Sequence, residues 1–275
     1  MKAAKLIRKF VKMFVLGLIA FISLIPFILI FFTSIKERVI ALSMPPVWFF
    51  VPTLRNYVDL LTNAVFLKAI LNSLVIASSS TLIAMVIGVL AGYGFSRFRF
   101  RGKGFFTYLI LALRMVPSIV FIIPYFVIWT TIRLNDTHLS MILMYLTLCL
   151  PLIILMMRSF VVDVPVELEE AAMVDGCSRW QTLRLILVPV LRPGILAAAT
   201  LAFISLWNDF ILAMFNTGRN TRTLTVEIYT SLSFYQLDWN KLSTSAVIAV
   251  IPAIIFISLT QKYIVRGLTM GAIKG

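Results

Sequence analysis

Charge is scarce in this sequence, and acidic charge is the scarcer sign. Of 275 residues, 11 are Asp or Glu, 25 are Lys or Arg and one is His, so 13% of the chain is Asp, Glu, Lys or Arg. A soluble domain is about 25% charged and about 45–50% apolar, whereas this chain is 61% hydrophobic. A water-soluble fold of this length would lack the polar side chains to cover its surface. We therefore expect lipid to be the solvent for most of the chain.

The residues that catalysis and metal binding need are also few. The two cysteines, Cys149 and Cys177, lie in different segments, and the one histidine, His138, has no second metal ligand beside it. No metal site, disulfide or nucleophile–base pair is predicted, and no catalytic residue is assigned. A phosphate-binding Gly-x-x-x-x-Gly-Lys-Ser/Thr sequence is missing too, because Gly102-Lys103 is followed by another glycine. The chain is therefore expected to hold no cofactor.

Basic residues outnumber acidic ones, and the net charge is +14. In a soluble protein this excess would suggest nucleic acid as a partner. Here the basic residues lie mostly in short segments between apolar runs. Anionic lipid headgroups and membrane orientation explain that distribution better, so no nucleic-acid partner is expected.

Long hydrophobic runs are what the sequence has in abundance. A spanning helix needs ~20 mostly apolar residues, and six segments meet this requirement: roughly 10–32, 69–95, 105–131, 139–157, 194–214 and 242–264. The third contains Pro117 and Pro124, which predict a kink. No strand alternation is long enough for a membrane barrel. We predict an all-α, polytopic membrane protein in which residues 1–275 form a single domain with six transmembrane helices.

The basic residues also predict the orientation of the spans. Sixteen of them lie in the N-terminal tail, in the connection 97–103, in the segment 158–193 and at the C-terminal end, while eight lie on the opposite side. Because positive charge marks the cytoplasmic side, both termini and segment 158–193 are expected in the cytoplasm. The longest external connection, 33–68, is rich in aromatic residues that suit either the membrane interface or a partner, and its role stays open.

An acidic, helix-prone stretch, DVPVELEEAAMVDG, occupies residues 163–176 of the cytoplasmic segment. Asp163 is expected to cap a short helix, with Pro165 in its first turn and glutamates that complement the helix dipole. Gly176 is expected to end that helix. Ser178 and Gln181 then have the spacing of a capping box that starts a second helix. We expect Pro189 and Pro193 to break this second helix before the fifth span.

This pair of helices favours a docking element over a solvated charged loop. A loop needs neither two caps nor alanines, and the small face of Ala171, Ala172 and Gly176 permits close approach by another backbone. The surrounding carboxylates offer charge-assisted contacts. The partner is expected to be another protein.

The same residues resemble the cytoplasmic motif of permease subunits in binding-protein-dependent ABC importers. That motif is Glu-Ala-Ala, three residues, Gly, nine residues, then Ile-x-Leu-Pro. The corresponding positions here are Glu170, Ala171, Ala172, Gly176, Ile186, Val188 in place of leucine, and Pro189. The carbohydrate branch of these permeases, the maltose-importer type, is resembled at PTLRNY 52–57, NSLVIA 72–77, AGYGFSRFRFRGK 91–103, WNDF 207–210 and GLTMGAIKG 267–275.

The resemblance implies a permease subunit that forms half of a translocation pathway for a sugar, polyol or related carbohydrate in a bacterial-type inner membrane. Segment 158–193 would be the coupling-helix loop, docking a separate ATPase through Glu170, Ala171, Ala172, Asp175 and Gly176. The implied partners are a second homologous permease, two ATPase subunits that bind ATP and Mg, and an extracytoplasmic solute-binding protein. The terminal GAIKG resembles a tail that contacts the ATPases in some family members.

Four polar or aromatic residues are candidates for the substrate path. Arg114 is expected near mid-membrane, about 14 Å beyond Phe105 along its helix, facing a polar cavity, a partner subunit or an internal ion-pair partner. Trp207, Asn208 and Asp209 suit a sugar ring and its hydroxyls, although Asn and Asp also hydrogen-bond spans to one another. The alternative function is an ATP-independent secondary transporter or channel, for which Asp209 is the candidate ion-coupling acid.

Overall fold

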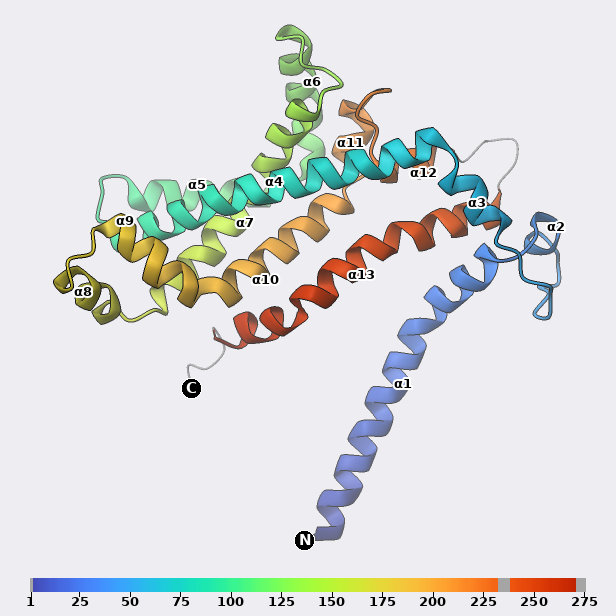
Figure 1. The fold of residues 1–275 in the computed structure, drawn as a ribbon, viewed down its shortest axis with the longest axis horizontal. Helices are drawn as coiled ribbons and strands as arrows, with labels where there is room; N and C mark the ends of the chain where they lie inside the picture. The colour runs from blue at the N-terminus through green and yellow to red at the C-terminus, as the bar shows by residue number, and fades with distance from the viewer. Residues whose placement is uncertain (1, 232–237, 271–275) are drawn as a thin grey trace. The chain divides into compact units, whose positions relative to one another are not determined.

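The computed structural model describes residues 2–231 and 238–270, and within these ranges every regular element is a helix. The chain divides into two compact units, one of residues 1–67 with 228–251 and one of residues 68–227 with 252–275. Figure 1 shows the course of the helices from the N-terminus onward. The expectation of a single transmembrane domain over 1–275 stays a prediction.

The first unit contains one long apolar helix and a small polar cluster. Its helices are α1 (Lys2–Ser34), α2 (Arg38–Ala41), α3 (Arg55–Leu61) and the beginning of α13 (Trp239–Met270). The amide of Asn56 donates to the carbonyls of Ser34 and Lys36 at 2.8 and 3.0 Å, and the amide of Asn240 donates to Asn56 Oδ1 at 3.0 Å. These bonds tie the end of α1 to α3 and to the start of α13.

The second unit carries the remaining helices. They are α4 (Ala64–Arg97), α5 (Lys103–Met115), the 3-10 turn η1 (Ser118–Phe121), α6 (Ile122–Thr131), α7 (His138–Val162), α8 (Glu167–Val174), α9 (Arg179–Thr182), the π turn η2 (Leu183–Leu187), α10 (Val188–Trp207), α11 (Ile211–Asn216), α12 (Leu224–Thr230) and the end of α13.

The core of the second unit is centred on α7. Tyr145, Ile153 and Met157 of this helix are fully buried, and small residues let the neighbouring helices approach it closely. A Cβ added to Gly92 of α4 would lie 2.6 Å from Met157 Cβ and 2.9 Å from the backbone nitrogen of Arg158. Close contact of this kind is how helices associate in lipid, where apolar side chains gain little by leaving the solvent.

Five described helices are long and apolar enough to cross a membrane: Ile7–Ser34, Ala64–Arg97, His138–Val162, Arg179–Trp207 and Trp239–Lys262. The third predicted span, 105–131, is instead a pair of segments, Lys103–Met115 and Ser118–Thr131, bent by 98°. The break falls at Val116, which is extended because Pro117 follows it. Pro124 does not add a kink, since it lies in the first turn of α6.

Candidate functional site

The acidic stretch forms α8, but its predicted N-terminal cap is wrong. Helix α7 continues to Val162, and Asp163 is the residue that ends it, with its backbone N–H donating to the carbonyl of Ser159 at 3.2 Å. Helix α8 begins after Val166, and the side chain of Val166 makes no capping hydrogen bond to the start of the helix. Its first turn holds three glutamates, and their charge complements the positive end of the helix dipole.

The C-terminal end of α8 is the predicted glycine stop. Gly176 has φ +88°, a left-handed conformation that glycine adopts without a steric penalty. Its N–H donates to the carbonyl of Met173 at 3.1 Å, and the N–H of Cys177 donates to the carbonyl of Ala172 at 3.0 Å. This pair of bonds is the Schellman motif. A Cβ on Gly176 would meet no atom within 4 Å, so the backbone conformation, and not space, requires the glycine.

A buried ion pair anchors α8 to the end of α4. Glu169 is 4% exposed, and its Oε1 accepts from Arg97 Nε at 2.5 Å. Arg97 Nη2 also donates to the carbonyl of Val164 at 2.7 Å, and the hydroxyl of Tyr93 donates to Glu169 Oε2 at 3.3 Å. Sequence reasoning missed both Arg97 and Glu169. The available signal was the helical spacing of Glu169 and Ala172, the two α8 residues that face inward.

The opposite side of α8, which we call the outer face, consists of Glu170, Ala171, Val174, Asp175 and Gly176, all exposed. Four of the five predicted coupling residues therefore lie together on this face, whereas Ala172 is buried against the chain's own residues. Val174, which sequence reasoning did not select, is 87% exposed. An apolar side chain held out in this way between two carboxylates is suited to contact with another protein.

The second helix starts as predicted and continues where a break was expected. Ser178 Oγ accepts from the N–H of Gln181 at 3.3 Å, and Gln181 Oε1 accepts from the N–H of Ser178 at 2.7 Å, which confirms the capping box. The predicted break at Pro189 and Pro193 is wrong, since α10 contains both prolines. The π turn η2 precedes α10, and a local i→i+5 turn absorbs the register change that a proline imposes.

The substrate-path candidates are divided between exposed and buried positions. Arg114 lies in the last turn of α5, is exposed, and has no ion-pair partner within the described ranges. Asn208, at the end of α10, is also exposed. Trp207 is buried and stacks on Phe203 with ring centroids 5.9 Å apart.

Asp209 is engaged in hydrogen bonds between segments. Its Oδ2 accepts from the hydroxyl of Tyr145 at 3.0 Å and from the N–H of Ala213 at 3.2 Å. Its carbonyl accepts from the hydroxyl of Thr225 at 2.8 Å. The contacts of Asp209 are therefore those of a residue that joins helices α7, α11 and α12.

A second polar network, missed by sequence reasoning, lies at the loop between α6 and α7. The carboxylate of Asp136 accepts from the N–H groups of Gly218, Asn220 and Thr221, each at 2.9 Å, and from the hydroxyl of Thr221 at 2.7 Å. Burial alone would raise the pKa of Asp136, but these donors, the Thr221 hydroxyl foremost, hold the pKa below its ordinary value. The network fixes the loop before α12 to the start of α7.

Comparison with known proteins places the chain among transporter components. Residues 84–270 match the family model described as "Binding-protein-dependent transport system inner membrane component". The chain is 35% identical over 254 residues to the sulfoquinovosyl glycerol transport system permease protein SmoH of Agrobacterium fabrum, covering 92% of this chain and 89% of SmoH. It is 36% identical over 262 residues to the trehalose/maltose transport system permease protein MalG of Thermococcus litoralis, covering 94% of each.

A solved structure shares the fold. The crystal structure of a bacterial ABC transporter involved in the import of the acidic polysaccharide alginate aligns with a TM-score of 0.78 at 22% identity, over 94% of this chain and 96% of that one. At this identity the likeness shows the fold alone.

Proposed function

This chain belongs to the family of binding-protein-dependent transport system inner membrane components, and on that premise we propose that it moves a sugar, a polyol or a related carbohydrate. The chain is a multi-pass permease subunit of the inner membrane and is not itself the ATPase. The substrate class is supported by the relatives, whose names state transport of sulfoquinovosyl glycerol and of trehalose and maltose.

The proposed mechanism rests on one observation, the exposure of the outer face of α8. This face presents exposed Val174 beside the carboxylates of Glu170 and Asp175. Its helix is held by the Arg97–Glu169 ion pair on one side and ended by the Schellman motif at Gly176. Because α8 is fixed in this way, its displacement is transmitted to α4 and, through α9, to α10. We infer that a separate ATPase subunit grips this face and moves the spans when it closes.

The proposed assembly contains a second homologous permease, two ATPase subunits that bind ATP and Mg, and an extracytoplasmic solute-binding protein. Both termini and α8 lie in the cytoplasm in this proposal, because most basic residues fall on that side, and the helix Arg179–Trp207 leads from there into the membrane. The substrate path lies between the two permeases. Arg114 and Asn208 offer exposed polar groups to it, while Trp207 and Asp209 support the path from within the helix packing.

Reconstitution tests the proposal. The permease is incorporated into proteoliposomes with its second permease, ATPase subunits and binding protein, and uptake of radiolabelled trehalose, maltose and sorbitol is measured with ATP inside the vesicles. We expect uptake of at least one of these compounds, and loss of that uptake when the ATPase subunits are omitted. Equal uptake without the ATPase subunits would contradict the mechanism, and ATP-dependent uptake of amino acids or peptides in place of carbohydrates would contradict the substrate class.

A further inference from the structure

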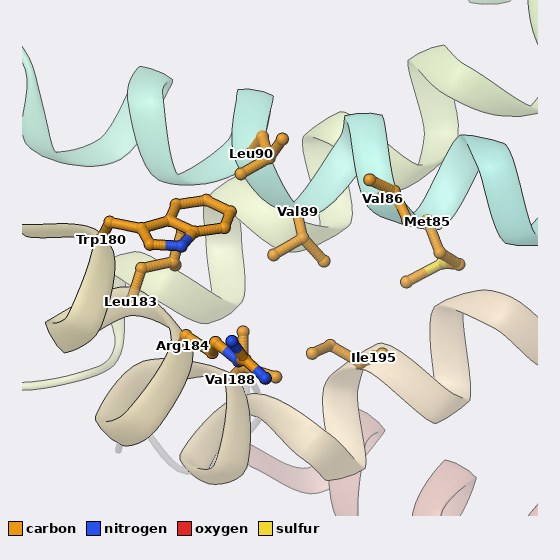
Figure 2. Close-up of a pocket in the computed structure, with 9 residues that line it drawn as sticks. All are labelled: Met85, Val86, Val89, Leu90, Trp180, Leu183, Arg184, Val188 and Ile195. Carbon is orange, nitrogen blue, oxygen red and sulfur yellow. The ribbon is translucent and has the colours of Figure 1, made fainter.

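An apolar groove lies between α4 and the helix that follows α8 in the chain, which comprises α9, η2 and α10. Its volume is about 270 Å³, and seven of the nine residues that line it are aliphatic or methionine. Figure 2 shows Val86 and Leu90 of α4 on one wall and Leu183, Val188 and Ile195 of η2 and α10 on the other. The two remaining residues are Trp180 of α9 and Arg184 of η2. A groove with so little hydrogen-bonding capacity does not suit a sugar.

Two positively charged side chains lie along the groove. Arg184 lines it, and Arg192 lines an adjoining hollow that shares Val188 and Ile195 with it. Both arginines are exposed, and in the part of the chain that the structure describes neither forms an ion pair with Asp or Glu. A cation within a membrane-spanning helix is costly unless a counter-charge or water reaches it. The ligand that completes this site therefore carries negative charge at one end and apolar surface at the other.

The depth of the groove identifies the membrane leaflet that supplies such a ligand. Leu90 and Met85 precede Arg97 by seven and twelve residues, which corresponds to about 10 to 18 Å along α4. Half of the hydrocarbon core is about 15 Å thick. With Arg97 at the edge of the hydrocarbon core, Leu90 lies within the leaflet at the α8 end of the unit and Met85 lies near the bilayer midplane. Trp180, at the edge of the groove and 61% exposed, is the kind of residue that sits at the level of lipid headgroups.

The groove is continuous with a surface that faces its surroundings along the rest of α4. Val75, Leu82 and Val86 are exposed apolar residues at helical spacing, and Val86 also lines the groove. An acyl chain that enters at Arg184 therefore has apolar surface beneath it along α4. Burial of each methylene group of that chain is favourable because it replaces contact with disordered neighbours by contact with a fixed wall.

We propose that this groove binds one anionic phospholipid, with an acyl chain between α4 and α10 and the phosphate at Arg184. Arg192 supplies a second positive charge to the same headgroup region. Trp180 and Arg184 belong to the helix that directly follows α8 and its glycine turn. The bound lipid therefore packs against the helix that supports the outer face. The inference depends on the chain being a membrane protein and not on which substrate it carries.

Native mass spectrometry of the assembled transporter tests the proposal. The purified complex is incubated in detergent with equal amounts of phosphatidylglycerol and phosphatidylcholine that have identical acyl chains, and the retained lipids are counted. We expect the wild-type complex to retain phosphatidylglycerol about fivefold more than phosphatidylcholine, the preference that one arginine near the surface provides. Arg184→Gln should lower this preference to the part that Arg192 provides, whereas Arg101→Gln, which removes an equal charge from the exposed connection before α5, should leave it unchanged.

A second variant distinguishes a lipid in the groove from a protein that occupies the same groove. Val86→Trp fills the groove and should lower retention of both lipids. Equal retention of the two lipids by the wild-type complex, or an Arg184→Gln variant that behaves like Arg101→Gln, would overturn the proposal, and neither result depends on the folding of Val86→Trp. Dissociation of the two permeases by Val86→Trp with unchanged lipid retention would also overturn it, because the occupant would then be a helix of the second permease.

Discussion

Arg97 Nε lies 2.5 Å from Glu169 Oε1, and this buried pair joins the last turn of α4 to the first turn of α8. The same guanidinium donates to the carbonyl of Val164 in the link between α7 and α8. One arginine therefore connects the end of α4, the α7–α8 link and the first turn of α8.

Removing one partner of this pair should be costly. We expect Arg97→Gln to destabilise the contact by about 3–5 kcal/mol, because it leaves the Glu169 carboxylate buried without a counter-charge. The double variant Arg97→Met with Glu169→Leu should recover most of that loss, since no buried charge remains. Thermal unfolding of the purified complex measures both effects. Glu170→Gln is the control, because Glu170 is exposed on α8 and its substitution should not change the melting temperature.

Replacing Gly176 should strain the turn that ends α8. Its φ of +88° costs an L-residue about 1–2 kcal/mol, and no neighbouring atom would clash with a Cβ. Gly176→Val should therefore reduce the coupling of ATP hydrolysis to transport, while Gly176→Asn, which tolerates this conformation better, should retain more of it. Coupling is read as substrate transported per ATP hydrolysed. Gly104→Ala, at a helical position with open space around it, should have no effect, and equal coupling in all three variants would contradict the role of the turn.

The local features of the site were predictable from sequence because they depend on neighbouring residues. The glycine stop at Gly176 and the capping box of Ser178 and Gln181 each involve residues within five positions of one another, so their spacing is visible in the sequence. The assignment of Asp163 as the first residue of a new helix failed because a residue between two helices can cap either of them. Helix α7 extends to Val162, so Asp163 is its C-terminal cap.

The features that sequence reasoning missed require tertiary contact. Nothing in the spacing of Arg97 and Glu169, which are 72 residues apart, indicates that they meet. The same holds for Asp136 and the backbone of Thr221, 85 residues apart. Proline marked the position of the break in the third span at Pro117, but the sequence did not indicate the angle of 98° between its two halves. At Pro189, the π turn replaced the expected break.

Val174 should contribute to ATPase docking because it is the exposed apolar residue of the outer face. Val174→Ser is expected to weaken association with the ATPase subunit by about 1–2 kcal/mol, or roughly 5- to 30-fold, since burial of a valine side chain is worth about that much. The permease alone should unfold at an unchanged temperature. Val162→Ser is a matched control, because Val162 is exposed at the end of α7 and lies outside the outer face. Equal affinity of both variants for the ATPase subunit, measured by surface binding, would exclude Val174 from the contact.

Asp136 should make the stability of the loops around α7 and α12 depend on acidity. Hydrogen bonds from Thr221, Gly218 and Asn220 hold its folded-state pKa below the ordinary value, which is about 3.9. A lowered carboxyl pKa contributes stability that is fully present above about pH 3.9 and is lost as the pH falls through the folded-state pKa. Asp136→Asn, which presents one acceptor oxygen where the carboxylate presents two, should destabilise the protein by about 1–3 kcal/mol at neutral pH. The melting-temperature difference between wild type and this variant should therefore be constant from pH 7 to about pH 4 and shrink below it. Asp59→Asn, at an exposed position of α3, should show no difference at neutral pH, and a difference for Asp136→Asn that grows on acidification would contradict the assignment.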